Sequence, residues 1–399
     1  MLGLVSVVLT FAASFAALPV GVFIVEVLAA ITLARWQRPA SVLAGTRRRV
    51  AVLVPAHNEA TDLLATLEDI KPQLQAGDRL IVIADNCTDT TPVLAVSAGA
   101  EVIERREPKK VGKGYALARG VEHLNMDPPD VVIVIDADCR VAKGCIDQLA
   151  LTCIEYDRPV QALDLITAPD KTTVESRVAE FAWRIRNWVR PLGLWSLNLP
   201  CQLMGTGMAF PWKLLHSTNV KGGSLVEDLN LGLSLAAAGS APLFCPSTAV
   251  VSRLPFSLEA ASIQRQRWQQ GHIQAILRMS PKLLYTAIVN ANVDLLALTM
   301  DLIVPPLSLL AMLLVILFSL AILASFFGLS TAPLLISGVT LVFYIIGVTI
   351  SWWVCGRDLL APARILGLSP YLSAQLRLYR KILTHRTPPK WIRTDRGKR

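Results

Sequence analysis

Two carboxylates at the end of an apolar run are the residues best placed to do chemistry. Asp136 and Asp138 follow Val131-Val-Ile-Val-Ile135, in which every residue is β-branched. An unbroken run of this kind predicts a central strand of a parallel sheet, buried on both faces. Ligands of open α/β sheets bind beyond the carboxyl ends of such strands. Two carboxylates there suit Mg²⁺ or Mn²⁺, which complete their coordination with phosphate oxygens.

Polar residues also follow the other strands expected in the first part of the chain. Strands alternating with helices at this spacing predict a doubly wound α/β fold with a parallel sheet, although the alternation weakens beyond Arg140. The expected strands and the polar segments after them are Val50–Val54 with Pro55-Ala-His-Asn-Glu59, Leu80–Ala84 with Asp85, and a strand near Glu101–Glu104 with Gly112-Lys-Gly114.

Three further segments carry residue types suited to a reaction. Thr206 lies between Gly205 and Gly207, and glycines allow the backbone to approach a ligand closely. Glu227 and Asp228 stand near the start of an expected helix, where acids are also favoured as partners of the helix dipole. The third segment, within an expected helix, is Gln264-Arg-Gln-Arg-Trp268.

Together these residues suit a reaction on a nucleotide diphosphate. A metal at Asp136 and Asp138 would neutralise the phosphates, and the ammonium of Lys113 would add a point charge. Arg267 would hold the leaving group with its planar fork. Asp228 is the candidate base for an incoming hydroxyl, and Trp268 offers a flat apolar face for a sugar.

Long apolar segments indicate a membrane protein. The chain of 399 residues is 53% hydrophobic, with a mean hydropathy of +0.48. Between 302 and 356 it has no charged residue, and this predicts a transmembrane hairpin at about 302–327 and 333–355. Residues 1–34 contain one charge, Glu26, and predict an uncleaved anchor that either spans once or bends at Pro19. We expect Glu26 to contact a neighbouring helix.

Basic residues predict the orientation of these spans. The segment 357–399 holds eleven Lys or Arg and two Asp. Its net charge therefore equals the formal net charge of the whole chain, +9. The positive-inside rule then places the central domain and this tail in the cytoplasm, on a multi-pass protein of the inner membrane. Charge gathered beside a hairpin favours anionic lipid headgroups over nucleic acid as a partner. The seven scattered cysteines indicate neither a zinc site nor a disulfide framework.

The same observations divide the chain into five parts. A cytoplasmic catalytic domain lies between membrane segments, and a basic amphipathic tail follows them. The expected parts are the amino-terminal anchor at 1–36, the α/β domain at 48–280, an interfacial helix at 281–301, the transmembrane hairpin at 302–356 and the tail at 357–399.

The ordered set of motifs resembles the family 2 glycosyltransferases, and more narrowly the membrane-integrated group of cellulose, hyaluronan, chitin and poly-N-acetylglucosamine synthases. The resemblance covers about Val50–Trp268. It implies a GT-A fold, a nucleotide-sugar donor that is UDP-linked in most relatives, a divalent metal, and inversion at the anomeric carbon. The implied activity is that of a hexosyltransferase of class EC 2.4.

The resemblance also implies a role for each matching residue. Asp136 and Asp138 match the metal-binding Asp-x-Asp, with Asp138 the more direct ligand, and Asp228 matches the base of the Thr-Glu-Asp motif, here Val226-Glu227-Asp228. The other matches are nucleoside contacts at Ala56, Glu59 and Asp85, a diphosphate contact at Lys113, the Gln-x-x-Arg-Trp motif at Gln264, Arg267 and Trp268, and a basic tail element at Arg393.

Two departures from the family leave the acceptor open. Where cellulose synthases have Phe-Cys-Gly-Ser, this chain has Met204-Gly-Thr-Gly-Met208. The three spans expected here are also too few to enclose a polysaccharide channel. The acceptor is therefore either a growing saccharide, with a homo-oligomer or an export partner supplying the channel, or a membrane lipid. These departures do not decide between a saccharide and a lipid acceptor. Of the two, we favour polysaccharide assembly.

Two other classes of function compete with this interpretation. A non-catalytic sugar-nucleotide sensor or assembly scaffold would have no need to keep Asp136, Asp138, Asp228 and Arg267 together. A nucleotidyltransferase can use a similar sheet, but it would carry a Gly-rich, basic phosphate loop after the first strand. Pro55-Ala-His-Asn-Glu59 is not such a loop.

Overall fold

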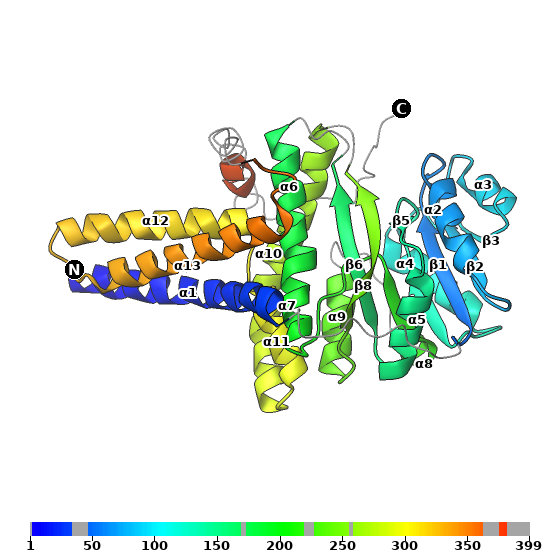
Figure 1. The fold of residues 1–399 in the computed structure, drawn as a ribbon, viewed down its shortest axis with the longest axis horizontal. Coiled ribbons are helices and arrows are strands. Elements are labelled where there is room, and N and C mark those ends of the chain that lie inside the picture. The colour runs from blue at the N-terminus through cyan, green and yellow to red at the C-terminus, as the bar shows by residue number, and fades with distance from the viewer. Residues whose placement is uncertain are drawn as a thin grey trace. The chain divides into compact units, whose positions relative to one another are not determined.

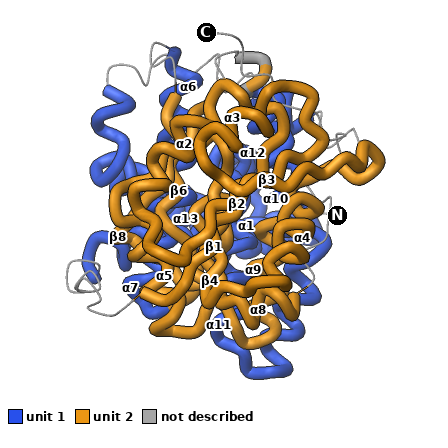
Figure 2. Tube along the Cα trace, turned by 90° about the vertical axis from the view of Figure 1, so that its right-hand side faces the viewer, with its two compact units in different colours: residues 1–36, 170–198, 262–389 blue, residues 37–169, 199–261, 390–399 orange. Residues whose placement is uncertain are grey.

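The computed structural model describes residues 2–33, 47–168, 173–218, 227–254, 258–361 and 375–380. The chain divides into two compact units, which Figure 2 colours separately. We call residues 37–169, 199–261 and 390–399 the sheet unit. We call residues 1–36, 170–198 and 262–389 the helical unit.

The sheet unit contains one sheet, whose described strands lie in the order β3-β2-β1-β4-β7-β6-β8-β5 (Figure 1). Between residues 50 and 134 each apolar run forms a strand, and a helix follows each of the first three of these strands, as the alternation predicts. The strands are β1 (Val50–Ala56), β2 (Arg79–Asp85), β3 (Glu101–Arg105), β4 (Val131–Val134), β5 (Arg140–Val141), β6 (Val160–Thr167), β7 (Met208–Pro211) and β8 (Leu243–Arg253).

The directions of the strands correct the prediction of a parallel sheet. Strand β1 is parallel to β2 and β4, and β2 is parallel to β3, as predicted. Strand β7, however, is antiparallel to both β4 and β6, so the sheet is mixed. The apolar run of β4 predicts only that this strand is buried on both faces, and a buried strand accepts a neighbour of either direction.

The two faces of the sheet are covered by different helices. In β1, the side chains of Val52 and Val54 enter one core cluster, and those of Ala51 and Leu53 enter the other, because successive side chains of a strand point to opposite faces. Residues from α2, α3 and α5 complete the first cluster, and residues from α4, α8 and α9 complete the second.

The helices of the sheet unit are short. One of them, α4, begins at Lys113, directly after Gly112, whose φ of +141° lies in a region that favours glycine. The described helices are α2 (Leu63–Ile70), the 3₁₀ turn η1 (Lys71–Gln73), α3 (Thr91–Ser97), α4 (Lys113–Leu124), α5 (Cys145–Tyr156), α8 (Trp212–Ser217) and α9 (Glu227–Ala237).

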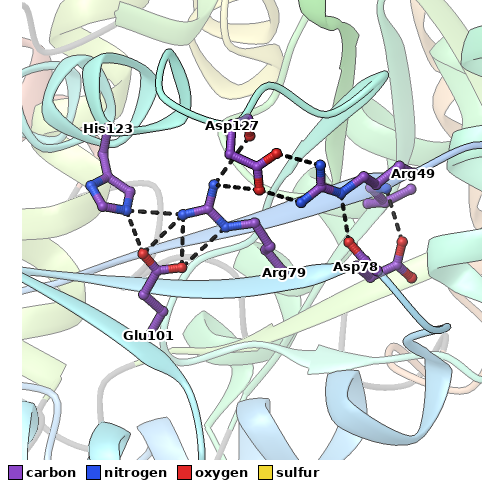
Figure 3. A network of polar contacts seen from close by, with 8 residues as sticks. Arg49, Asp78, Arg79, Glu101, His123 and Asp127 are labelled. Carbon is purple, nitrogen blue, oxygen red and sulfur yellow. Dashed lines mark hydrogen bonds and ion pairs between the residues drawn. The ribbon is translucent and has the colours of Figure 1, made fainter.

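Ion pairs gather at the amino-terminal ends of β1, β2 and β3 (Figure 3). Arg79 Nη2 lies 2.8 Å from Glu101 Oε2, and His123 Nε2 contacts the other oxygen of the same carboxylate. Arg49 Nη1 donates to Asp127 Oδ1 at 2.5 Å, and Arg79 Nη1 donates to the backbone oxygen of Asp127 at 3.2 Å. We call these five residues the amino-edge network.

The helical unit contains the long apolar helices. Among the described residues, three helices are long and apolar enough to cross a membrane: α1, α12 and α13. Helix α10 runs without interruption through Pro281, so no helix boundary marks residue 280. The described helices are α1 (Leu2–Thr32), α6 (Val174–Arg184), the π-helix η2 (Ile185–Val189), α7 (Arg190–Ser196), α10 (Leu258–Val289), α11 (Val293–Leu302), α12 (Leu307–Phe326) and α13 (Ala332–Cys355).

A buried ion triad joins α1, α7 and α11. Arg190 Nε donates to Glu26 Oε2 at 2.6 Å, and Arg190 Nη2 donates to Asp301 Oδ1 at 2.5 Å. All three side chains are buried, and a buried charge is tolerated when it is paired. The expected contact of Glu26 with a neighbouring helix is confirmed. Helix α1 is continuous through Pro19, so the bend considered at that residue does not divide it.

Candidate active site

The turn after β4 carries Asp136 and Asp138. Ile135 is fully buried, and its N–H donates to Leu53 O of β1 at 3.1 Å, which fixes the end of the strand. The buried hydroxyl of Thr66 then donates to Ala137 O and Cys139 O, both at 2.8 Å. Because both carbonyls share one donor from α2, the backbone around Asp138 is held tightly.

Lys113, the first residue of α4, lies at the same edge of the sheet. Its ammonium pairs with the carboxylate of Asp136 and donates to Gly205 O at 2.6 Å. Burial alone would lower the pKa of Lys113, but Asp136, and then Glu227 and Asp228, raise it above its ordinary value. Lys113 is therefore a fixed cation surrounded by acids.

The glycine loop before β7 completes this edge. Gly205 has a φ of +99°, which favours glycine. A Cβ atom on Gly205 would lie 3.3 Å from Asp228 Oδ2, so the loop backbone passes directly beside that carboxylate. The N–H of Asp136 donates to Thr206 Oγ1 at 3.0 Å. The loop thus contacts the Asp136 segment, the cation and the candidate base.

Glu227 and Asp228 open α9, as predicted. Burial raises the pKa of Glu227 to about 7, although Lys113 and a hydrogen bond from the backbone of Gly114 lower it. One oxygen of the Glu227 carboxylate is buried and has no hydrogen-bond partner among the residues that the structure describes. The structure therefore brings together six of the predicted residues: Lys113, Asp136, Gly205, Thr206, Glu227 and Asp228.

The predicted nucleoside contacts lie at the ends of β1 and β2. Ala56 and Ala84 are paired across these parallel strands, and His57 Nδ1 donates to the backbone oxygen of Asp85 at 2.6 Å. The carboxylate of Asp85 accepts from Arg105 Nη1 at 2.5 Å. Burial raises the pKa of Asp85, although Arg105 lowers it. The N–H of Glu59 donates to Thr91 Oγ1 at 2.9 Å, which holds the first loop.

The remaining predicted residues belong to other parts of the chain. Gln264, Arg267 and Trp268 lie on α10 in the helical unit, where the Trp268 ring packs on that of Trp183 with centroids 4.7 Å apart. Arg393 lies outside the described residues. The roles of these four residues stay predictions.

Three residues at this edge were missed by the sequence analysis. Thr66 is a hydroxyl on the apolar face of α2, and Gln161 is a fully buried amide in an otherwise apolar stretch of β6. Arg105 is a buried cation at the end of β3. In each case a polar residue at a position patterned for the core is the signal that could have revealed it.

The donor set at this edge fits a hard divalent cation. Mg²⁺ and Mn²⁺ bind through one or two carboxylates and take further oxygens from phosphates and water. Asp136 already holds a cationic group, the Lys113 ammonium, and Asp138 follows it on the same turn. Within the described ranges, no group of three or more His, Cys, Asp or Glu side chains is arranged for a metal. A metal ion here would bind the carboxylates of Asp136 and Asp138, and the substrate would supply further oxygen ligands.

Comparisons with known proteins identify the family of this chain. A family model described as "Glycosyltransferase like family 2" matches residues 47–271. YdaM of Bacillus subtilis, described as a probable glycosyltransferase, is 27% identical over 245 residues, which are 58% of this chain and 56% of that protein. Glucosyl-3-phosphoglycerate synthase of Mycobacterium tuberculosis is 32% identical over 114 residues, which are 26% of this chain and 34% of the relative. The chain thus spans about a third of the length of that relative.

A solved structure shows a similar fold. It is the mannosyltransferase PcManGT from Pyrobaculum calidifontis in complex with GDP-Man and Mn²⁺. The TM-score is 0.54 at 17% sequence identity, and the match covers 97% of this chain and all of that one.

The sheet with acids at its carboxyl-terminal edge and the matching family model define one class of protein. This chain belongs to the family 2 glycosyltransferases, because the family model covers more than half of its residues. The resemblance seen in the sequence is confirmed at the level of the family. The narrower likeness to membrane-integrated polysaccharide synthases stays a prediction.

Proposed function

We propose that this protein is a membrane-anchored, inverting glycosyltransferase that moves a hexose from a nucleotide-sugar donor to an acceptor hydroxyl. The observation that carries the proposal is the arrangement around Gly205. The Gly205 carbonyl accepts from Lys113, which pairs with Asp136, and a Cβ atom on Gly205 would lie 3.3 Å from Asp228 Oδ2. A cation for a leaving diphosphate and a base for an incoming hydroxyl thus lie at one edge of the sheet.

On the donor side, the chain supplies fixed charge. Lys113 stays protonated because three acids surround it, so it neutralises charge that develops on the departing diphosphate. Asp136 and Asp138 would hold Mg²⁺ or Mn²⁺, which supplies Lewis-acid stabilisation of the phosphate oxygens when bound. The similar PcManGT structure contains Mn²⁺, which supports this choice of metal.

On the acceptor side, Asp228 takes the proton from the attacking hydroxyl. A carboxylate within hydrogen-bond reach of a hydroxyl makes it a better nucleophile. Gly205 leaves the Asp228 carboxylate accessible from the loop, because any side chain there would crowd it at 3.3 Å. Burial raises the pKa of Glu227 to about 7, so Glu227 adds only part of a second negative charge beside Asp228 at neutral pH.

The donor nucleotide is assigned to the ends of β1 and β2. Ala56, Glu59 and Asp85 would contact the base and ribose, and UDP is the nucleotide most frequent among the resembled enzymes. The PcManGT structure holds GDP-Man instead, so both nucleotides belong in the test. Gln264, Arg267, Trp268 and Arg393 are proposed to hold the diphosphate and shape the acceptor end.

We propose a saccharide acceptor in polysaccharide or exopolysaccharide synthesis, at the cytoplasmic face of the inner membrane. A membrane lipid is the second candidate, and one observation favours it. The described residues include only three helices able to span a membrane, which are too few to enclose a polysaccharide channel. A polymer would then require a homo-oligomer or an export partner.

Turnover of candidate donors by the purified protein tests the proposal. The full chain in detergent or nanodiscs, with Mn²⁺, should release nucleotide diphosphate from a UDP- or GDP-sugar when membrane lipids or oligosaccharides are supplied. Chelation with EDTA should abolish release, and added Mn²⁺ or Mg²⁺ should restore it. Mass spectrometry of the product identifies the donor sugar, the acceptor and the number of additions.

The outcomes separate the competing functions. A glycolipid product favours the lipid acceptor, and an oligosaccharide ladder favours polymer synthesis. Binding of nucleotide sugar without any release, with or without acceptor, would support a sensor or scaffold instead. Formation of a nucleotide sugar from a sugar phosphate would indicate a nucleotidyltransferase.

A further inference from the structure

We propose that Gln161 is a positioning residue of the transfer reaction, and that its buried amide fixes the Gly205 loop between Lys113 and Asp228. This inference rests on the proposed function. Gln161 is fully buried in β6 and makes three hydrogen bonds to the backbone. Its Oε1 accepts from Met204 N at 2.8 Å, and its Nε2 donates to Thr206 O and Ala162 O, each at 2.8 Å.

The orientation of this amide is set by its partners. Met204 contributes an N–H and Thr206 a carbonyl, so only one of the two amide orientations satisfies both. The two contacts fall on the residues immediately before and after Gly205. Gln161 therefore holds the loop on both sides of the glycine that faces the reacting groups.

The loop needs an anchor of this kind because it contains two glycines. Gly205 and Gly207 both have positive φ, at +99° and +65°, and glycine loses more conformational freedom than any other residue when it is ordered. A Cβ atom on Gly205 would lie 3.3 Å from Asp228 Oδ2, and the freedom that lets the backbone approach this carboxylate would also let it move away. Bonds on either side of Gly205 remove that freedom.

The fixed loop also links the two halves of the site. Gly205 O accepts from Lys113 Nζ at 2.6 Å, and Thr206 Oγ1 accepts from Asp136 N at 3.0 Å. A shift of the loop would therefore displace the diphosphate cation and the metal-side turn relative to Asp228. A carboxylate has no donor and an apolar side chain has neither donor nor acceptor, so neither can replace this amide fully.

Gln73 provides a matched control in the same unit. Its Nε2 donates to Asp69 O at 2.8 Å and to Ala142 O at 3.1 Å, and its Oε1 accepts from Ile146 N at 3.3 Å. It is thus a second glutamine that bridges three backbone groups, but none of them belongs to the Gly205 loop. Gln161→Met and Gln73→Met each remove two donated hydrogen bonds and one accepted hydrogen bond, and both keep the length of the side chain.

The test combines hydrogen exchange and kinetics on the full chain in detergent. In Gln161→Met, amide exchange in peptides covering 201–208 should become faster, whereas Gln73→Met should leave it unchanged. The kcat of transfer should fall about tenfold or more in Gln161→Met, the size expected for a lost buried hydrogen bond, and within about twofold in the control. The affinity for nucleotide diphosphate, measured by calorimetry, should change far less than kcat.

Several results would overturn the proposal. Unchanged exchange at 201–208 in Gln161→Met would show that the amide does not hold the loop, whatever the activity. Faster exchange with a kcat equal to that of Gln73→Met would show that the loop position does not matter for transfer. If Gln161→Met does not fold, Gln161→Glu keeps the acceptor for Met204 N–H and should show the same two effects. If wild-type protein transfers no sugar, the proposed function fails while the exchange data still decide whether Gln161 anchors the loop.

Discussion

The acids at the two ends of the parallel strands have pKa values that are shifted in opposite directions. We call the amino-terminal ends of these strands the amino edge and their carboxyl-terminal ends the carboxyl edge. At the amino edge, burial alone would raise the pKa of Glu101, but hydrogen bonds from Arg79 and His123 lower it below its ordinary value. At the carboxyl edge, burial raises the pKa of Glu227 to about 7 and also raises that of Asp85. The ionised form of Glu101 at the amino edge is thus stabilised, whereas burial disfavours the ionised forms of Glu227 and Asp85 at the carboxyl edge.

This difference separates stability from function. The acids of the amino-edge network are paired with neighbouring arginines. Removing one partner should therefore change the free energy of unfolding only slightly and leave the transfer activity unchanged. The carboxyl edge concentrates three acids around one lysine, an arrangement that is worth keeping only if a ligand uses it. A substitution at one of these edges can therefore be compared with a substitution at the other edge or at a matched residue elsewhere in the sheet unit.

The largest effect is expected at the candidate base. Asp228→Asn should lower kcat for transfer by about 10³-fold, because an amide cannot take a proton from the acceptor hydroxyl. Donor affinity, measured by calorimetry with Mn²⁺, should stay close to wild type.

Asp147→Asn is the matched control for Asp228→Asn, since Asp147 also lies in the first turn of a helix of the sheet unit. It should retain activity. Loss of donor binding in Asp228→Asn would contradict the role of Asp228 as a base on the acceptor side.

The second effect concerns the cation. Lys113→Met should lower kcat/KM for the donor by about 10²-fold, the usual consequence of losing one preorganised charge at a departing group. Steady-state kinetics with varied donor measure this loss. Lys110→Met is the reference, because Lys110 pairs with Glu107 at 3.0 Å on the surface, and it should behave as wild type. Equal losses in both variants would indicate a general effect of reduced positive charge.

A smaller effect is expected from the turn that carries Asp138. Thr66→Val keeps the shape of the side chain but removes the donor to Ala137 O and Cys139 O. We expect a roughly tenfold loss of kcat and a higher concentration of Mn²⁺ for half-maximal activity. Thr152→Val is the control, since the Thr152 hydroxyl donates to Gln148 O of its own helix at 2.7 Å and also contacts Cys245 Sγ, and neither partner belongs to the turn that carries Asp138. An unchanged Mn²⁺ requirement in Thr66→Val would argue against this support of the metal side.

The smallest effect is expected at the amino edge. Because the folded-state pKa of Glu101 is lowered, its ionised form stabilises the fold above pH 4.5 and this stabilisation is lost as the pH falls through the folded pKa. Glu101→Gln should therefore lower the unfolding free energy by less than about 1 kcal/mol at pH 7, since the side chain is partly exposed.

Thermal unfolding across pH checks the Glu101→Gln prediction, with the difference from wild type vanishing as the pH falls through the lowered folded-state pKa of Glu101. Transfer activity should be unchanged. A large loss of activity in this variant would break the separation between the two edges.

Much of the sheet could be predicted because its strands obey local rules. Val50–Val54 and Val131–Ile135 are apolar runs that only a buried strand explains, and their carboxyl ends carry Asp136 and Asp138 as expected. The direction of β7 could not be predicted, since Met208–Pro211 is a short buried strand whose neighbours are far away in the sequence.

The parts of the site that were predicted are residues with distinctive chemistry. Lys113, Asp136 and Asp228 are charged residues at strand or helix ends, and the structure places them together. Thr66 and Gln161 were missed because each bonds to backbone groups 43 or more residues away that need a hydrogen-bond partner. No local pattern reports which distant carbonyl lacks a donor.

The stereochemistry of the first product tests the central claim most directly. A single displacement with Asp228 as base inverts the anomeric centre, so an α-linked nucleotide sugar should give a β-linked product by proton NMR of the earliest product formed. Retention of the α configuration, or release of nucleotide diphosphate without transfer of the sugar, would contradict the account.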